Sequence, residues 1–175
     1  MRTAKTILTV IQERGKQHKP IERVYKLLFN REFYLNAYAK LYPNNGALTK
    51  GVTEETVDGM SIQKIDRMIE LLREEKYQWK PARREYIPKK NGKKRPLGIP
   101  TWGDKLLQEV MREILEAYYE PQFSTHSHGF RPNRGCHTAL QEIQVWKGTR
   151  WFIEGDISKY FDTIDPAVLL KILEK

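Results

Sequence analysis

One acidic residue near the end of this sequence has the setting of a metal ligand. Asp156 closes the apolar run in WFIEGDIS, and Asp162 and Asp165 follow soon after. A carboxylate at the end of a buried strand is costly unless it is paired or binds a metal. Polymerases use two or three such carboxylates to hold two magnesium ions. Asp165 precedes Pro166 and is expected to cap a helix, and Asp162 is expected beyond the strand end. The local pattern therefore supplies one convincing metal carboxylate, which is too few for two-metal catalysis.

The most charged stretch is RREYIPKKNGKKRPLGIP, residues 83–100. Asn91-Gly92 favours a tight turn between two extended segments, so we expect an antiparallel hairpin. The stretch from Lys80 to Arg95 holds eight basic residues and a single acid, Glu85. Such a run is often only a solvated face, but a hairpin projects its basic tip away from the body.

Two cations of this hairpin are candidates for gripping a triphosphate or a nucleic-acid backbone. They are Lys89 and Arg95, because arginine offers phosphate a forked contact and lysine a point charge. Three further lysines are candidates for contacts with RNA, although the sequence does not distinguish RNA contact from solvation: Lys90, Lys93 and Lys94.

A third candidate site is HSHGFRPNRGCHTAL, residues 126–140. Gly129 and Pro132 bracket a turn that could present an aromatic side chain and two cations to a nucleic-acid strand. These three residues are Phe130, Arg131 and Arg134. Burial of Phe130 in the core is an equally good interpretation for that residue. A zinc site built from Cys136 and nearby histidines (His126, His128 and His137) is disfavoured, because their spacing matches no structural zinc pattern.

Composition points to a folded protein with an acidic partner. The 175 residues include 39% hydrophobic and 30% charged residues, with a formal net charge of +9 and a pI near 9.6. Such an excess of positive charge favours nucleic acid as the partner, against a basic surface that binds nothing in particular. Cys136 is the only cysteine, which excludes an internal disulfide and fits a reducing compartment. We find no secretory signal and no apolar run long enough for a membrane span, so we expect a cytoplasmic protein.

Periodicity places these candidates on expected elements. Amphipathic helices are expected over 3–14, 21–42, 62–77, 104–119 and 137–146, with a final helix from 166. Thr101 and Asp104 could form a capping box. Residues 43–61 indicate a long loop, and residues 150–158 a buried strand.

Three blocks, taken in order, resemble one family. They are PARREYIPKKNGKKRPLGIPTWGDKLLQEVMREILEAYYEPQF, SHGFRPNRGCHTAL and RWFIEGDISKYFD, and LYPNNGALTKGVTEETVDGMS before them is also family-like. Together they resemble the reverse transcriptase encoded by group II introns, also called a maturase, in particular the lactococcal type. The resemblance implies an α+β fold: the fingers subdomain of a right-hand polymerase, made of helices and an antiparallel hairpin, with the first palm strand. It divides the chain into an N-terminal RNA- and template-binding segment (1–50), fingers (51–148) and the start of the palm (149–175).

The resemblance also implies residue roles. Asp156 matches the first magnesium-binding aspartate, and the backbone of Ile157 would help to hold the metal. Phe161 matches the aromatic residue under the incoming sugar, and Lys89 and Arg95 match the residues that grip the nucleotide triphosphate. A block lining the template path is matched by Phe130, Arg131, Pro132 and Arg134. The implied cofactor is Mg²⁺, and the implied partners are group II intron RNA, an RNA template with a DNA primer, and dNTP.

The sequence departs from the family at one decisive motif. It contains no Tyr-x-Asp-Asp segment, which carries the family's second carboxylate pair. We therefore expect an N-terminal portion of a longer RNA-directed DNA polymerase that does not polymerise DNA by itself. One alternative is an RNA-binding maturase module that aids splicing without polymerase activity. Another is an inactive scaffold whose unpaired palm edge allows self-association.

Overall fold

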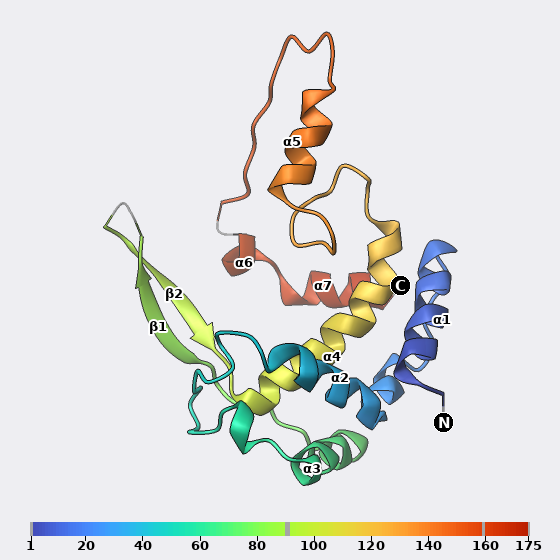
Figure 1. Cartoon of the computed structure of the whole chain (residues 1–175), viewed down its shortest axis with the longest axis vertical. Coiled ribbons are helices and arrows are strands. Elements are labelled where there is room, and N and C mark those ends of the chain that lie inside the picture. Colours follow the sequence, from blue (N-terminus) through green and yellow to red (C-terminus); the bar gives the residue numbers. More distant parts are fainter. Residues whose placement is uncertain (1, 90–91, 159, 175) are drawn as a thin grey trace. The chain divides into compact units, whose positions relative to one another are not determined.

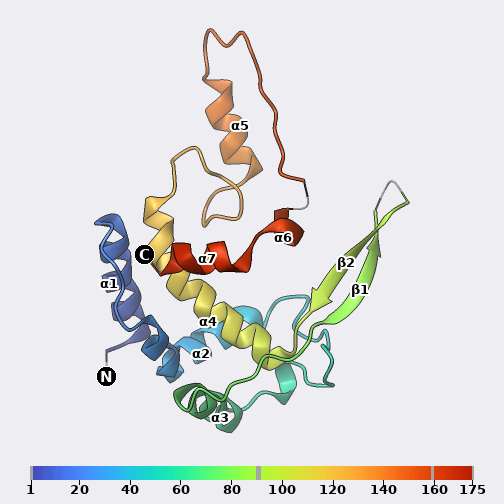
Figure 2. The same cartoon turned by 180° about the vertical axis from the view of Figure 1, so that it is seen from behind.

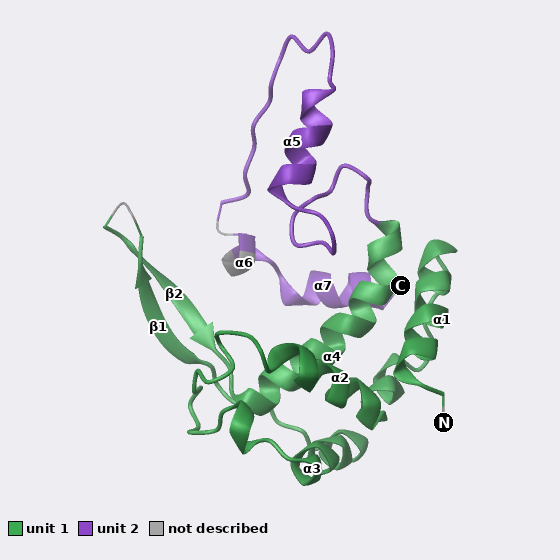
Figure 3. Cartoon of the chain, viewed as in Figure 1, with its two compact units in different colours: residues 1–122 green, residues 123–175 purple. Residues whose placement is uncertain are grey.

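The structure, a computed structural model, describes residues 2–89, 92–158 and 160–174, the side chains of residues 161 and 162 excepted. The chain forms two compact units, Met1–Gln122 and Phe123–Lys175 (Figure 3). No helix among the described residues is long and apolar enough to cross a membrane.

The described residues of the first unit form four α-helices and one hairpin (Figure 1), together with three short 3-10 helices. The α-helices are α1 (Ala4–Lys16), α2 (Arg31–Leu41), α3 (Ile62–Arg73) and α4 (Trp102–Tyr119). The 3-10 helices are η1 (Val24–Phe29), η2 (Val57–Gly59) and η3 (Glu120–Gln122). Polar side chains begin the α-helices as expected: Ser61 caps α3, and Thr101 accepts from the Asp104 amide at the start of α4.

The helix expected over 21–42 is interrupted, which corrects the sequence-based prediction. Asn30 has an extended backbone, and its side chain accepts a hydrogen bond from the Glu32 amide as the N-cap of α2. The residues before it form η1 instead. An asparagine that satisfies a free amide starts a new helix more readily than it continues an old one. The apolar spacing of 21–42 is thus divided between two elements.

The core of the first unit lies where α1, α2, α3 and α4 face one another. Fully buried side chains come from α2 and α4: Phe33, Tyr34, Leu106, Leu107, Val110 and Ile114. Ile65, Ile69 and Leu72 of α3 join them at the spacing of one helical face. The apolar stripes predicted from the sequence are therefore core, as expected.

Two glycines allow backbones to approach closely in this unit. A Cβ on Gly15 of α1 would lie 2.1 Å from the carbonyl oxygen of Tyr118 in α4. A Cβ on Gly51 would lie 2.7 Å from the carbonyl oxygen of Pro100, at the end of the hairpin. Any side chain at either position would push packed backbone apart. Views from opposite sides show α1 running beside α4 (Figures 1 and 2).

The predicted hairpin is confirmed. Strands β1 (Arg83–Pro88) and β2 (Lys94–Ile99) pair antiparallel, with Arg83 opposite Ile99 and Pro88 opposite Lys94. At the tip, Gly92 has φ 77° and donates a 3.0 Å hydrogen bond to the Lys89 carbonyl. Glycine adopts this left-handed conformation without steric cost. Both views show the hairpin extending away from the helices of its unit (Figures 1 and 2).

In the part of the second unit that the structure describes there are three helices. They are α5 (Cys136–Gln144), α6 (Tyr160–Thr163) and α7 (Pro166–Leu173). The predicted start of α7 is confirmed, since Asp165 accepts from the Ala167 amide at 2.8 Å and Pro166 occupies the first turn. The short helix α6 was not predicted.

The strand expected over 150–158 does not form. These residues have no regular secondary structure, and the apolar side chains of Trp151, Phe152 and Ile153 are exposed. A strand is stabilised by hydrogen bonds to a neighbouring strand. In the described part of the chain, the one sheet has two strands, β1 and β2, and they pair with each other. The premise that burial makes Asp156 costly is therefore wrong for this structure, because the Asp156 side chain is exposed to water.

Candidate nucleotide and nucleic-acid interface

The hairpin register places Lys89 and Arg95 on one face. Side chains alternate along each strand, so Arg95, directly opposite Ile87, shares the face of Arg83 and Glu85. Lys89 continues this alternation, and its amide donates a 2.7 Å hydrogen bond to the Lys93 carbonyl. The two cations predicted to grip a triphosphate thus lie near each other at the exposed end of the hairpin. We call the side with Arg83, Glu85, Ile87, Lys89, Arg95, Leu97 and Ile99 the Arg95 face.

The opposite side of the hairpin has a different composition. It carries Arg84, Tyr86 and Pro88 from β1, with Lys94, Pro96 and Gly98 from β2, and all six are exposed. We call it the outer face. Of the lysines predicted to contact RNA, Lys94 belongs to this face, Lys93 lies opposite Lys89 at the end of the other face, and Lys90 lies outside the described residues.

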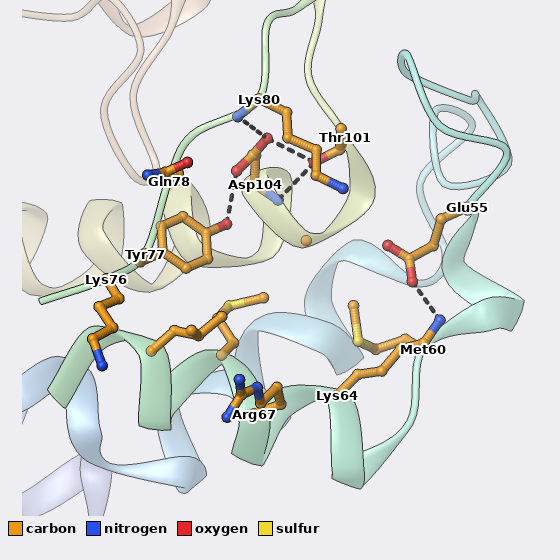
Figure 4. A pocket seen from close by; sticks show the side chains of 13 residues that line it. Glu55, Met60, Lys64, Arg67, Lys76, Tyr77, Gln78, Lys80, Thr101 and Asp104 are labelled. Atoms are coloured by element: carbon orange, nitrogen blue, oxygen red, sulfur yellow. Dashed lines mark hydrogen bonds and ion pairs between the residues drawn. The ribbon is translucent and has the colours of Figure 1, made fainter. Parts of the chain in front are cut away.

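A buried carboxylate holds the two ends of the hairpin together. Asp104 at the start of α4 accepts hydrogen bonds from the Thr101 hydroxyl at 2.6 Å and from the Lys80 amide at 3.3 Å (Figure 4). Lys80 lies before β1 and Thr101 follows β2, so the Asp104 side chain joins the segments at both ends of the hairpin. The predicted Thr101 cap is present, but the Asp104 carboxylate binds the Thr101 hydroxyl and the hairpin stem.

Tyr77 completes this network. Its hydroxyl donates a 2.7 Å hydrogen bond to Asp104 Oδ1 (Figure 4). Burial, together with the hydrogen bond to Asp104, raises the pKa of Tyr77 above its ordinary value. The network faces a cavity of about 360 Å³ whose rim carries the cations Lys64, Arg67, Lys76 and Lys80 (Figure 4). Sequence patterns identified Asp104 only as a cap and gave no role to Tyr77.

The predicted long loop is tied to the base of the hairpin. Lys105 of α4 donates from Nζ to the carbonyls of Gly46 at 3.2 Å and Thr49 at 3.0 Å. Arg83 of β1 donates from Nε to the Lys50 carbonyl at 3.1 Å. Burial lowers the pKa of Lys105, and the nearby Arg83 charge adds to that effect. These hydrogen bonds therefore hold the loop against the hairpin and α4. The composition of the loop did not predict them.

In the second unit, two arginines predicted at the template path brace their own loop. Arg131 donates from Nη1 to the carbonyls of Ser124 at 2.6 Å and Ser127 at 2.9 Å, and Arg134 donates to the Thr125 carbonyl. The Arg131 guanidinium also lies over the Phe123 ring, 5.3 Å from its centroid. Contact of these arginines with a template stays a prediction.

Phe130 projects from this braced loop. Its side chain is fully exposed and its backbone has φ 56°, in the left-handed region that a phenylalanine rarely adopts. Burial of Phe130 in the core, one of two sequence-based interpretations, is therefore wrong. Pro132 is also exposed. An exposed aromatic ring on a loop that hydrogen bonds hold in place is available to stack on a nucleic-acid base.

Two histidines bind one carboxylate beside this loop. Glu142 of α5 accepts from His126 Nδ1 and from His128 Nε2, the latter at 2.8 Å, and His128 Nδ1 lies 2.8 Å from Thr138 Oγ1. These hydrogen bonds lower the pKa of Glu142. His137 and Cys136 are no part of this cluster. Sequence spacing alone did not show that Glu142 unites the first two histidines.

The described residues do not assemble a magnesium site. Asp156 is a single exposed carboxylate, and no three His, Cys, Asp or Glu side chains gather around a metal position within the described ranges. Magnesium requires several oxygen ligands in near-octahedral geometry. The side chains of Asp162 and of Phe161, the predicted sugar-contacting residue, lie outside the described residues.

Comparison with known proteins decides the family. The reverse transcriptase (RNA-dependent DNA polymerase) family matches residues 87–175, just over half of the chain. The chain belongs to this family. The match runs from β1 of the hairpin to the end of the second unit, so it includes Lys89, Arg95, the Phe130 loop and Asp156.

Three relatives of this reverse transcriptase family member have names that refer to introns. The chain is 47% identical over 99% of its length to the group II intron-encoded protein LtrA of Lactococcus lactis, of which it covers 30%. It is 46% identical, over 97% of its length, to an uncharacterized 91 kDa protein in the cob intron of Schizosaccharomyces pombe, covering 22% of it. A nuclear intron maturase of Arabidopsis thaliana is 40% identical over 43% of the chain, which covers 11% of it. The resemblance inferred from three sequence blocks is therefore confirmed. The chain spans less than a third of the length of these relatives.

Proposed function

We propose that this chain is the fingers and the start of the palm of an RNA-directed DNA polymerase encoded by a group II intron. The single observation that carries the proposal is the shared face of Lys89 and Arg95 at the hairpin tip, within the segment that matches the family. Two cations on one exposed surface suit the charge and spread of a triphosphate. In this proposal they bind the incoming dNTP, and Phe161 packs under its sugar.

The proposed second activity is binding of intron RNA to aid splicing and mobility. The three relatives described above are named after introns, among them an intron-encoded protein and an intron maturase. The formal charge of +9 supports a polyanionic partner. We assign intron RNA to the N-terminal segment, residues 1–50, with the fingers at 51–148 and the palm from 149 as functional divisions. Phe130, Arg131, Pro132 and Arg134 would line the path of an RNA template paired with a DNA primer.

Membership of the family implies dependence on a divalent metal in general. We propose Mg²⁺, with Asp156 and the Ile157 backbone as contributors to its site. One exposed carboxylate does not make that site, and the sequence has no Tyr-x-Asp-Asp segment to supply the others. We therefore expect these 175 residues to have no primer-extension activity alone.

A chimera tests the polymerase proposal. The chain would replace the matching third of the lactococcal intron-encoded protein, and extension of a DNA primer on an RNA template would be measured. We expect extension by the chimera and none by the chain alone. In the chimera, Asp156→Asn abolishes extension, whereas Lys89→Ala raises the KM for dNTP. A chimera that folds and binds RNA without extending a primer would favour the alternative, an RNA-binding maturase module with no polymerase activity of its own.

We also propose that the chain self-associates through residues 151–153. Three neighbouring apolar side chains, Trp151, Phe152 and Ile153, are exposed there, and exposed apolar runs favour association. Sedimentation over a range of concentrations tests this, with the triple substitution to Ser as the control. A monomer at high concentration would contradict it.

A further inference from the structure

The outer face of the hairpin has the chemistry of a binding surface for a nucleic-acid strand. Tyr86 lies at its centre, directly opposite Pro96, and is 58% exposed. Arg84 is two residues away on the same strand, and Lys94 is the diagonal neighbour on β2. In an antiparallel sheet these separations are about 7 Å. One exposed ring therefore stands between two cations.

The acidic residue of the hairpin lies on one of its two faces. Glu85, the single acid between Lys80 and Arg95, lies on the Arg95 face and forms an ion pair there with Arg83. The six residues of the outer face include no acid. Among the residues that the structure describes, neither Arg84 nor Lys94 has an ion-pair partner. An uncompensated pair of cations beside an aromatic ring complements a chain of phosphates and bases.

The rest of the first unit leaves this face open. On the Arg95 face, Ile99 is only 7% exposed and Arg83 is bound to the loop through the Lys50 carbonyl. On the outer face, Gly98 contributes no side chain opposite Arg84, and a Cβ there would meet only Ala82, at 3.4 Å. No side chain therefore projects from position 98 at the base of the outer face, which leaves room for a nucleic-acid strand to lie along the hairpin.

We propose that the outer face binds an unpaired RNA strand, with one base stacked on Tyr86 and the flanking phosphates bound by Arg84 and Lys94. Stacking requires a base whose face is free, which an unpaired strand offers and a regular duplex does not. The hairpin then has two tasks on opposite faces, a nucleotide triphosphate on one and an RNA strand on the other. The inference rests on the proposed function only in taking RNA as the ligand.

Equilibrium binding by the full chain tests this proposal. The probes are a labelled oligouridine of about 12 nucleotides and an RNA duplex of equal length. We expect Tyr86→Ala to weaken binding of the single strand about tenfold or more and to leave duplex binding unchanged. Tyr86→Phe keeps the ring and binds like wild type. Trp146→Ala is the matched control, because Trp146 is a similarly exposed aromatic residue (51%) just after α5 in the other unit, and it also binds like wild type.

The salt dependence of RNA binding tests the roles of Arg84 and Lys94. Removal of one phosphate contact to a single strand reduces the slope of log K against log salt by about 0.7. The double variant Arg84→Gln with Lys94→Gln is therefore expected to reduce that slope by about 1.4. An unchanged slope would overturn their assignment to phosphate.

The outcomes separate this inference from the proposed function. If wild type binds the single strand and Tyr86→Ala binds it equally well, the outer-face proposal is wrong and the proposed function stands. If Tyr86→Ala weakens duplex and single strand alike, stacking on an unpaired base is wrong. If wild type binds neither RNA at low salt, both proposals fail.

Discussion

The hydroxyl of Tyr77 lies 2.7 Å from Oδ1 of Asp104, and this hydrogen bond joins the segment before the hairpin to the helix after it. The same carboxylate binds Thr101 and the Lys80 amide. Every role proposed for the hairpin depends on a fixed base, because the hairpin extends away from the helices of its unit (Figures 1 and 2). The Tyr77–Asp104 pair is a partly buried part of that base.

Loss of the Tyr77 hydroxyl is expected to destabilise the first unit. Tyr77→Phe leaves one buried carboxylate oxygen without its donor, which costs about 1–3 kcal/mol in the free energy of unfolding. Urea denaturation measures the change, and hydrogen exchange in β1 and β2 should quicken with it. The matched control is Tyr86→Phe, whose exposed hydroxyl should change stability by less than about 0.5 kcal/mol. Equal stability of the two variants would contradict a structural role for the Tyr77–Asp104 bond.

Substitution of Gly15 tests the contact between α1 and α4. Gly15→Ala places a Cβ 2.1 Å from the Tyr118 carbonyl oxygen, so the two helices must separate. We expect a loss on the order of 3 kcal/mol in the free energy of unfolding. Gly46→Ala is the control, because a Cβ at Gly46 has no heavy atom within 4 Å. A Gly15→Ala protein as stable as Gly46→Ala would show that the helices do not pack this closely.

Acid is expected to loosen the Phe130 loop through Glu142. The hydrogen bonds from His126 and His128 lower the pKa of Glu142 below its ordinary 4.5. A lowered folded-state pKa means that the carboxylate stabilises the fold above the ordinary value, and that this contribution is lost as pH falls through the folded-state pKa. Wild type should thus melt at a higher temperature than Glu142→Gln at neutral pH.

That difference in Tm is expected to disappear on acidification, because a protonated Glu142 resembles glutamine. Thermal melts of both proteins from neutral pH to well below 4.5 measure it. A constant difference across that range would show that the ionised carboxylate does not support the loop.

Local signals in the sequence predict the helices and the hairpin because each depends on neighbouring residues. The Asn-Gly pair predicted a hairpin, and the two paired strands and the left-handed backbone of Gly92 are observed, while Asp165-Pro166 predicted the start of α7. The absence of a strand at 150–158 could not be predicted in this way, since pairing depends on a second strand that no local pattern reveals. The apolar residues of that segment favour burial, but they do not provide hydrogen-bond partners.

The same distinction applies to the candidate site: local patterns predict one part of it, and the other part depends on long-range contacts. Alternation along two strands predicts that Lys89 and Arg95 share a face once the register is known, and the turn sets that register. The contacts that position the site are long-range: Asp104 with Tyr77, Lys105 with the loop at Gly46, and Glu142 with two histidines. Each joins segments that are well separated in sequence, so spacing gave no sign of them.

We propose that this chain contacts RNA as part of a group II intron reverse transcriptase. Competition binding tests this proposal, with a labelled group II intron RNA against an unrelated structured RNA of equal length, at low and at near-physiological salt. We expect a preference for the intron RNA that persists at the higher salt, since recognition by shape and exposed bases is not purely electrostatic. Equal binding of the two RNAs that collapses as salt rises would contradict it.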